Sequence, residues 1–447
     1  MGPKPITVVA IIFGLVVGNG LGVRAAAAEA MPSSVAPEVV TLDRAVALAL
    51  AHHPSLRVAQ GTQAVNEARV GQAQSSFFPH VQARSAYQQA TANNATAFGG
   101  GPALRSTRGD NFGTYQNSVT LNQLFYDFGK VSSQVTSAEL AFQAAKSDAE
   151  TTAQTVIVTV QQAYFGLQQA QRLVTVAEEA LTQFTKHLDL AKGRYHAGVA
   201  PKIDVTTADV DLSNARLNLI TARNNEQVAH VRLNHAMGMT DPNPYRVEDP
   251  ALAPHPAISL VDAMATALRL RPELMAQQAL EQAAEATITT AQRDFFPTVS
   301  GLANYSYNGQ EFPLVYNWNL TGVVTVPLFS GFLTQQQVAE ARANLLRTKA
   351  NGEVLRQTIQ LEVHQALVNL EAARERLHVT AVTVTQAKER FALAEGRYRA
   401  GLSNAIEVTD AGVALVSAQV NDVVALSSYH AAHAQLDRAM GLSASAR

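Results

Sequence analysis

The chain has 447 residues, of which 47% are hydrophobic, 6% aromatic and 16% charged, with 34 Lys and Arg against 36 Asp and Glu. This balance gives no basic field, so we expect no nucleic-acid partner. The absence of cysteine excludes disulfide frameworks, thiolate metal sites, cysteine nucleophiles and the acylated Cys of a lipoprotein. The low aromatic content, with abundant Ala and Gln, favours long helices packed on small side chains.

Residues 1–30 have the pattern of a secretory signal peptide. Lys4 precedes the apolar run 6–17, and segment 25–30 offers small residues at the spacing that a signal peptidase reads. The apolar run is shorter than the roughly 20 residues that span a bilayer, which disfavours a transmembrane anchor. We therefore expect an exported protein that is cleaved after Ala30.

The sequence contains two copies of one unit, with the matching motifs in the same order. The matching pairs are 41–50 with 259–268, Phe77-Phe78-Pro79 with Phe295-Phe296-Pro297, Leu124-Phe125 with Leu328-Phe329, and the Gly-Arg-Tyr-x-Ala-Gly turns 193–198 and 396–401. Such self-similarity predicts a tandem repeat, with repeat 1 over 31–241 and repeat 2 over 259–442. Each repeat is expected to contain a helix, two strands and a long helical hairpin. The Pro-rich segment 242–258 is expected to be an extended connector, and 443–447 a short tail.

A heptad pattern runs through the second half of each repeat. Small or apolar residues alternate at spacings of four and three from Val160 to Tyr195 and from Val363 to Tyr398. Sustained heptads indicate coiled-coil packing. A helix from about Lys130 to Tyr195 would be roughly 100 Å long at about 1.5 Å per residue, and it is too polar for lipid. We therefore expect it to cross an aqueous gap.

Four segments alternate in polarity with a period of two. They lie near 80–91, 113–125, 298–308 and 315–328. The pattern fits strands with one face in lipid and one in water, although a half-buried soluble sheet would give the same pattern over one strand. The two Phe-Phe-Pro elements lie where helix becomes strand, because proline stops the helix, and their aromatic pairs suit an interfacial girdle or a junction core.

Four strands cannot close a membrane barrel, and open sheet edges are not tolerated in lipid. The barrel must therefore be shared between chains. Two chains would give eight strands and an interior filled by side chains, whereas three would give twelve strands and room for a conduit.

These features resemble the TolC-like outer-membrane efflux channels, also called outer membrane factors, of the non-lipidated type. The resemblance covers essentially the whole mature chain and includes the strand-to-helix junction 124–130. It implies an α+β membrane protein, a homotrimer whose twelve-stranded β-barrel lies in outer-membrane lipid and continues into a long periplasmic α-helical coiled-coil barrel. It also implies a periplasmic adaptor (membrane fusion) protein and an inner-membrane pump of the RND or ABC type as partners, in a Gram-negative bacterium.

The helical turns near 193–204 and 396–407 are expected at the periplasmic tip. Their glycines suit left-handed helix caps, so a plain hairpin turn explains them fully. Glu407 and Asp410 lie three apart and share a helix face, and Asp204 is the first copy's equivalent of Glu407. Charges at a helix start can also be dipole partners on a solvated face. The resemblance implies instead that Glu407 and Asp410 line the narrowest entrance, where six carboxylates in a trimer would attract cations.

The resemblance assigns further tip residues. Tyr398 matches a gating tyrosine, and Asp204 matches an aspartate of the tip network. The turns expected to dock the adaptor contain Gly193, Arg194, Tyr195, Gly198, Gly396, Arg397 and Gly401. Ser403 stands where the best-known member of the family has a gating arginine, and Arg397 or Arg399 is a candidate to replace it.

No motif for catalysis stands out. The twelve histidines include no His-Glu-x-x-His frame, and Gly99-Gly100-Gly101 precedes no helix. We therefore expect no enzyme, no catalytic residues, no cofactor and no metal site. The expected function is a passive outer-membrane exit duct, gated at its tip by adaptor and pump. The alternatives are a type I peptide or protein secretion duct and a non-conducting tether that spans the periplasm; the sequence does not separate the cargoes.

Overall fold

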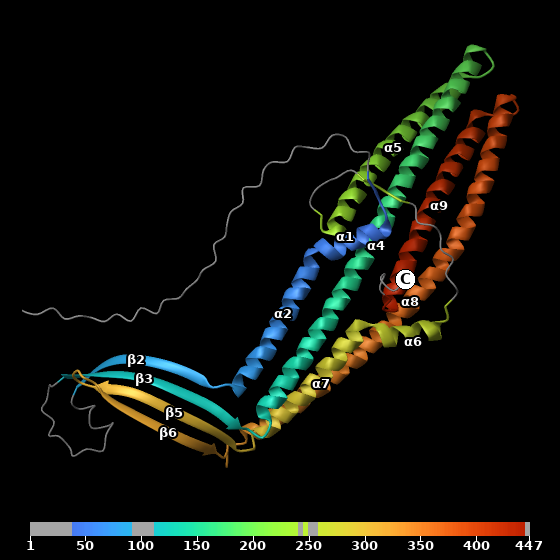
Figure 1. Ribbon diagram of the computed structural model, residues 1–447. Coiled ribbons are helices and arrows are strands. Elements are labelled where there is room, and N and C mark those ends of the chain that lie inside the picture. Colours follow the sequence, from blue (N-terminus) through green and yellow to red (C-terminus); the bar gives the residue numbers. More distant parts are fainter. Residues whose placement is uncertain (1–37, 92–110, 240–244, 249–257, 443–447) are drawn as a thin grey trace, which may run out of the picture. The chain divides into compact units, whose positions relative to one another are not determined.

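The computed structural model of the protein (Figure 1) describes residues 38–91, 111–239, 245–248 and 258–442. The expected signal peptide, the tail 443–447 and most of the connector 242–258 lie outside these residues.

The described elements follow one order twice: two helices, two strands, a long helix and a shorter helix. The first set is α1 (Leu42–His52), α2 (Pro54–Gln74), β2 (His80–Thr91), β3 (Asn111–Tyr126), α4 (Lys130–His196) and α5 (Lys202–Met237). The second set is α6 (Leu260–Leu270), α7 (Pro272–Arg293), β5 (Thr298–Gly309), β6 (Val315–Thr325), α8 (Leu333–Arg399) and α9 (Ala405–Ala439). Helix predominates over strand.

The helix expected at the start of each repeat is in fact two helices. The side chains of Thr41 and Ser259 accept backbone N–H groups and cap α1 and α6. Pro54 and Pro272 then begin α2 and α7. Because a residue before proline is driven out of the helical region, His53 is extended and the helix breaks there.

The long helix α4 begins at a capped junction. The carboxylate of Asp127, which is buried, accepts the backbone N–H groups of Gly129 (3.0 Å) and Val131 (2.6 Å). Gly129 itself has φ +89°, a conformation that glycine adopts at little cost. The chain therefore turns sharply from β3 into α4.

The described strands form a four-stranded antiparallel sheet in the order β2-β3-β5-β6. Tyr305 pairs with Trp318 on one face, and the adjacent pair Ser306 and Asn317 lies on the other. One face is thus aromatic and apolar and the other polar. Figure 1 shows that the sheet is open and twisted. The strand expected over 315–328 ends earlier, at Thr325, because Pro327 has no N–H for the ladder.

The long helices pack as two neighbouring hairpins. Helix α4 contacts both α5 and α9, and α9 contacts α8, so the packing order is α5-α4-α9-α8. The heptad residues Val160, Leu167 and Leu188 are buried, but Tyr195, expected at the end of this seam, is 43% exposed. The seam of α4 therefore ends before the tip.

Part of the Pro-rich connector is structured. Strands β1 (Glu38–Val40) and β4 (Tyr245–Val247) form a two-stranded sheet. The buried hydroxyl of Tyr164 on α4 donates to the carbonyls of Val40 (3.1 Å) and Glu248 (2.8 Å). This segment is anchored on α4, so it is more than the simple connector that the prolines predicted.

One helix in the described part of the chain, α9, is long and apolar enough to cross a membrane by length and composition alone. A packed helix of a soluble bundle passes the same test, and α9 packs along α8 and α4. In the single chain, 39% of its most apolar window is buried.

Candidate tip gate and constriction

The turn between α4 and α5 closes in a left-handed cap. Gly198 has φ +73°, and its N–H donates to the carbonyl of Tyr195 (2.9 Å). The N–H of Val199 donates to the carbonyl of Arg194 (3.0 Å). This pair of bonds is the Schellman arrangement, which satisfies the last carbonyls of the helix.

The turn between α8 and α9 has the same backbone geometry. Gly401 has φ +76°, and its N–H donates to the carbonyl of Tyr398 (3.0 Å). The N–H of Leu402 donates to the carbonyl of Arg397 (2.8 Å). Both repeated Gly-Arg-Tyr-x-Ala-Gly motifs therefore form one kind of turn.

Tyr398 lies at the contact between the two hairpins and is 1% exposed. Its hydroxyl donates to Oδ2 of Asp204, 3.3 Å away on α5. The guanidinium of Arg194 lies 4.6 Å from its ring centroid and donates to its backbone carbonyl. Burial, with a smaller contribution from Asp204, raises the pKa of Tyr398, so the hydroxyl stays protonated as a donor. We call Arg194, Asp204 and Tyr398 the tip lock.

His187 of α4 lies beside the tip lock and is 6% exposed, with its ring centroid 5.6 Å from that of Tyr398. Neither ring nitrogen has a hydrogen-bond partner among the described residues. Burial lowers the pKa of His187, whereas Asp211, Glu395 and Asp204 act to raise it. The neutral imidazole is therefore favoured by desolvation. Sequence reasoning missed His187 because it lies next to, not on, the heptad seam.

The acidic residues of the second tip have a different setting. Asn404 caps α9 by accepting the N–H of Glu407 (3.1 Å), and the Glu407 carboxylate lies 3.4 Å from the guanidinium of Arg397. Asp410 is exposed one turn later. Arg399 pairs instead with Glu395 of its own helix (2.9 Å).

These contacts distribute the tip arginines among three roles. Arg397 faces Glu407, Arg399 stays on its own helix, and Arg194, from the first tip, holds Tyr398. The hydroxyl of Ser403 is buried and has no hydrogen-bond partner among the described residues. From the sequence, Arg194 was expected only in adaptor docking. Because Arg194 and Arg397 occupy the same position of the repeated motif, the sequence did not indicate that their contacts would differ.

The two Phe-Phe-Pro elements lie at the junctions between helices and sheet. Phe77, Phe78, Phe295 and Phe296 are all exposed in the single chain, and the ring of Phe296 stacks on that of Phe128 with centroids 5.5 Å apart. Pro79 and Pro297 each directly precede a strand. The Lys130 ammonium pairs with the Asp294 carboxylate and ties the start of α4 to the end of α7.

No group of three His, Asp or Glu side chains in the described ranges is arranged to hold a metal ion. The site is thus a set of turns, one buried tyrosine and nearby charges. What such an arrangement can do is hold two helical hairpins together or release them.

Comparison with known proteins identifies the family. Residues 45–239 and 263–442 match the outer membrane efflux protein family. The probable efflux pump outer membrane protein TtgC of Pseudomonas putida is 25% identical over 331 residues, which cover 71% of this chain and 67% of TtgC. Toxin and drug export protein A of Aggregatibacter actinomycetemcomitans is 23% identical over 358 residues, 80% of this chain and 73% of that protein.

Solved structures show the same fold. The crystal structure of CusC, from work on its transmembrane channel formation, matches with a TM-score of 0.78 at 16% identity, over 90% of this chain and 92% of CusC. The expected resemblance to TolC-like channels is confirmed. The chain belongs to the outer membrane efflux protein family and is an outer-membrane protein of a Gram-negative bacterium.

Proposed function

We propose that three copies of this chain form a passive exit duct across the outer membrane, fed by an inner-membrane pump through a periplasmic adaptor. The observation that carries this proposal is that, in the described part of the chain, the sheet and the helical layer each end in edges without a partner. A further copy of the chain can cover each edge.

In the sheet, β2 and β6 have no partner strand on their outer sides within the described chain. Open edges are not stable in lipid, so β2 of one copy is expected to pair with β6 of the next. Such a heterologous contact closes into a ring, and three copies supply the twelve strands that leave room for a conduit. The aromatic face with Tyr305 and Trp318 would face lipid and the polar face the lumen.

In the helical layer, the outer helices α5 and α8 each expose an apolar stripe. On α5 the exposed apolar residues recur every seven positions at Ile203, Val210 and Leu217. On α8, Val379, Val382 and Leu393 are exposed over the same part of the hairpin, next to the tip. A seven-residue apolar repeat is the pattern of a coiled-coil seam. We infer that α5 of one copy packs on α8 of the next, in the same direction round the ring as the strands.

At the junction with the sheet, the exposed phenylalanines of the two Phe-Phe-Pro elements would lie at the periplasmic membrane interface, where aromatic side chains are favoured.

At the tip, three tip locks would hold the hairpins in a closed state. Adaptor and pump would open the duct by binding the open state better than the closed one. The adaptor would dock on the two glycine turns, where Val199, Leu402 and Ile406 expose apolar side chains. Glu407 and Asp410 would contribute six carboxylates to a constriction that prefers cations, with Arg397 partly offsetting Glu407.

The test is planar-bilayer conductance of the purified trimer. Wild type should pass small, cation-preferring currents, and Glu407→Ala with Asp410→Ala should weaken the preference. The matched control, Asp189→Ala with Asp209→Ala, removes the same number of exposed carboxylates away from the proposed ring. No current from folded trimers, even with Tyr398→Ala to open the tip, would support the tether instead.

A second cargo class has one specific observation in its favour. Toxin and drug export protein A is named for the export of both toxins and drugs, which supports a secretion role beside the efflux role. A deletion strain should be tested for susceptibility to drugs, dyes, metals and detergents and for loss of secreted peptides and proteins. Unchanged tolerance with lost secretion would favour the type I secretion role.

A further inference from the structure

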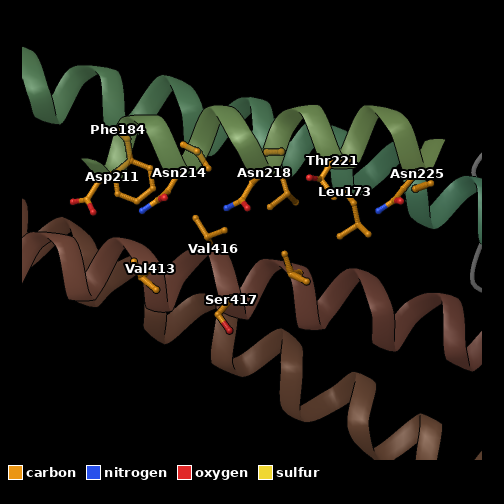
Figure 2. Close-up of a pocket in the computed structure, with 17 residues that line it drawn as sticks. Leu173, Phe184, Asp211, Asn214, Asn218, Thr221, Asn225, Val413, Val416 and Ser417 are labelled. Atoms are coloured by element: carbon orange, nitrogen blue, oxygen red, sulfur yellow. The ribbon is translucent and has the colours of Figure 1, made fainter. Parts of the chain in front are cut away.

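Between the two hairpins lies an open groove of about 440 Å³ whose lining comes from α4, α5 and α9. Figure 2 shows Leu173 and Phe184 of α4 together with Val413 and Val416 of α9 projecting into the same space. These side chains give the groove apolar walls. An apolar concavity of this size suits a small organic molecule.

The charge in the groove is of one sign. Asp211 of α5 is the one charged side chain among the described residues that line it, and no basic side chain joins it there. Its Oδ2 accepts the hydroxyl of Thr409 from α9 (2.8 Å), which fixes the carboxylate across the groove. The carboxylate retains acceptor capacity for a further donor. An anionic group beside apolar walls is complementary to a cation with an apolar body.

The groove continues the tip along both walls. Asp204, Asp211, Asn218 and Asn225 recur every seven residues of α5 and therefore lie along one side of the helix, which Figure 2 shows for the last three. The first of these residues accepts the hydroxyl of Tyr398 in the tip lock. The row thus leads from the gate into the groove.

On α9, Asp410, Val413 and Ser417 lie three and four residues apart and share one face. Val413 and Ser417 line the groove. The groove therefore opens on the same side of α9 as the carboxylate that we place at the constriction.

Trimer formation as proposed leaves this groove uncovered. The exposed stripe of α5 with Ile203, Val210 and Leu217 contains none of the lining residues, and α8 contributes none. The groove lies inside one protomer, between α5 and α9, whereas the neighbouring copies meet at α5 and α8.

We propose that this groove is a binding site for amphiphilic cations that pass the acidic entrance. The apolar body would pack against Phe184, Val413 and Val416, and the positive charge would lie at Asp211. The inference rests on the proposed duct for its role in cargo passage, but the binding itself can be measured on the trimer alone.

The experiment uses two ions of nearly equal size and shape and opposite charge. Binding of tetraphenylphosphonium and of tetraphenylborate to the detergent-solubilised trimer is measured by equilibrium dialysis. We expect saturable binding of the cation and weaker binding of the anion. Asp211→Asn, which can still accept from Thr409, should weaken cation binding about fivefold, as expected for one partly exposed charge pair. Asp209→Asn removes an exposed carboxylate from the same helix outside the groove, and it should leave cation binding unchanged.

Three results would overturn the site: equal binding of cation and anion, equal binding by wild type and Asp211→Asn, or no saturable binding by trimers that conduct. Cation binding by folded trimers that do not conduct would instead remove the duct and leave the site.

Discussion

The two tips have the same backbone turn, but their equivalent side chains differ in burial and in contacts. Tyr398 is 1% exposed at the second tip, whereas its equivalent Tyr195 at the first is 43% exposed. Arg194 reaches across to hold Tyr398, while its equivalent Arg397 stays within its own hairpin and faces Glu407. A repeated motif therefore fixes the local turn but not the partners.

The reason lies in what each tip faces. The turn needs only backbone hydrogen bonds and a glycine with positive φ, all supplied within six residues. The side chains of Tyr398 and Arg194, by contrast, are placed by contacts between the hairpins. Because α4 packs against α9, the first hairpin lies beside the second tip and contacts Tyr398. Within one chain, the first tip provides the contacts and the second provides the buried tyrosine.

The largest expected difference between the tips comes from removing the tyrosines. Tyr398→Ala should lower the free energy of opening the second tip by about 3 kcal/mol, since it empties a buried ring site. Tyr195→Ala should change it by less than about 0.5 kcal/mol, because the ring is largely solvated. Hydrogen exchange of the Gly401 and Leu402 amides measures both. Equal effects would show that the two tips are equivalent in the assembled protein.

Replacing the two arginines should change the free energy of opening the second tip by smaller amounts than replacing the tyrosines, and again unequally. Arg194→Ala removes a hydrogen bond to a buried carbonyl and a cation–π contact, which together contribute about 2 kcal/mol. Arg397→Ala breaks a solvent-exposed pair with Glu407 and should cost less than about 0.5 kcal/mol. The same exchange measurement applies, with Arg194→Lys as the control that keeps the charge. A larger effect of Arg397→Ala than of Arg194→Ala would show that Arg397, and not Arg194, stabilises the second tip.

The glycines should behave alike. Gly198→Ala and Gly401→Ala each place a Cβ at positive φ, which costs about 1 kcal/mol. Space is not the obstacle, since a Cβ at Gly198 meets nothing within 4 Å and one at Gly401 meets only Arg194 at 3.8 Å. Exchange of the amide after each glycine should accelerate similarly. Unequal values would indicate that tertiary contacts, and not the turn alone, hold one of the glycines.

The smallest effect expected is a pH dependence that acts on the second tip. Burial lowers the pKa of His187 in the folded state below its ordinary value of 6.5. The stability that it contributes is therefore present above pH 6.5 and is lost as the pH falls through the lowered pKa. Opening of the tip should increase as the pH falls from about 7 to about 5.

The control for this dependence is His187→Gln, which removes the titrating group. Its second tip should open with less dependence on pH than that of wild type, as followed by conductance and by exchange at Gly401. A mutant with the full wild-type dependence would assign the effect to the carboxylates around His187, namely Asp204, Asp211 and Glu395.

Much of the fold followed from periodicity. Strands β2, β3 and β5 lie within two residues of the ranges expected from alternation, and α4 spans Lys130–His196 where about Lys130 to Tyr195 was expected. The errors have local causes. Proline at 54 and 272 divides the first helix of each repeat, and Pro327 ends β6 early.

The candidate site was predictable only in part. The family resemblance assigned Asp204 and Tyr398 to the tip separately, and the structure adds that the Tyr398 hydroxyl lies 3.3 Å from Oδ2 of Asp204. His187 and Asp211 carry no motif, because a buried histidine and an aspartate beside a groove look like any polar residue of a helix until the neighbouring helix is placed. The arginine that contacts Tyr398 is Arg194 of the other repeat, and neither of the expected candidates, Arg397 and Arg399; no local pattern indicates this contact.

The sequence by itself determined the elements, their repetition, the glycine turns and the family, since these depend on backbone preferences and on polarity patterns along one chain. Only the tertiary structure decided which tyrosine is buried, which arginine holds it and where the groove opens. Those features arise from side chains about 200 residues apart, such as Arg194 and Tyr398 with a separation of 204, and packing of one hairpin on the other is what brings them together.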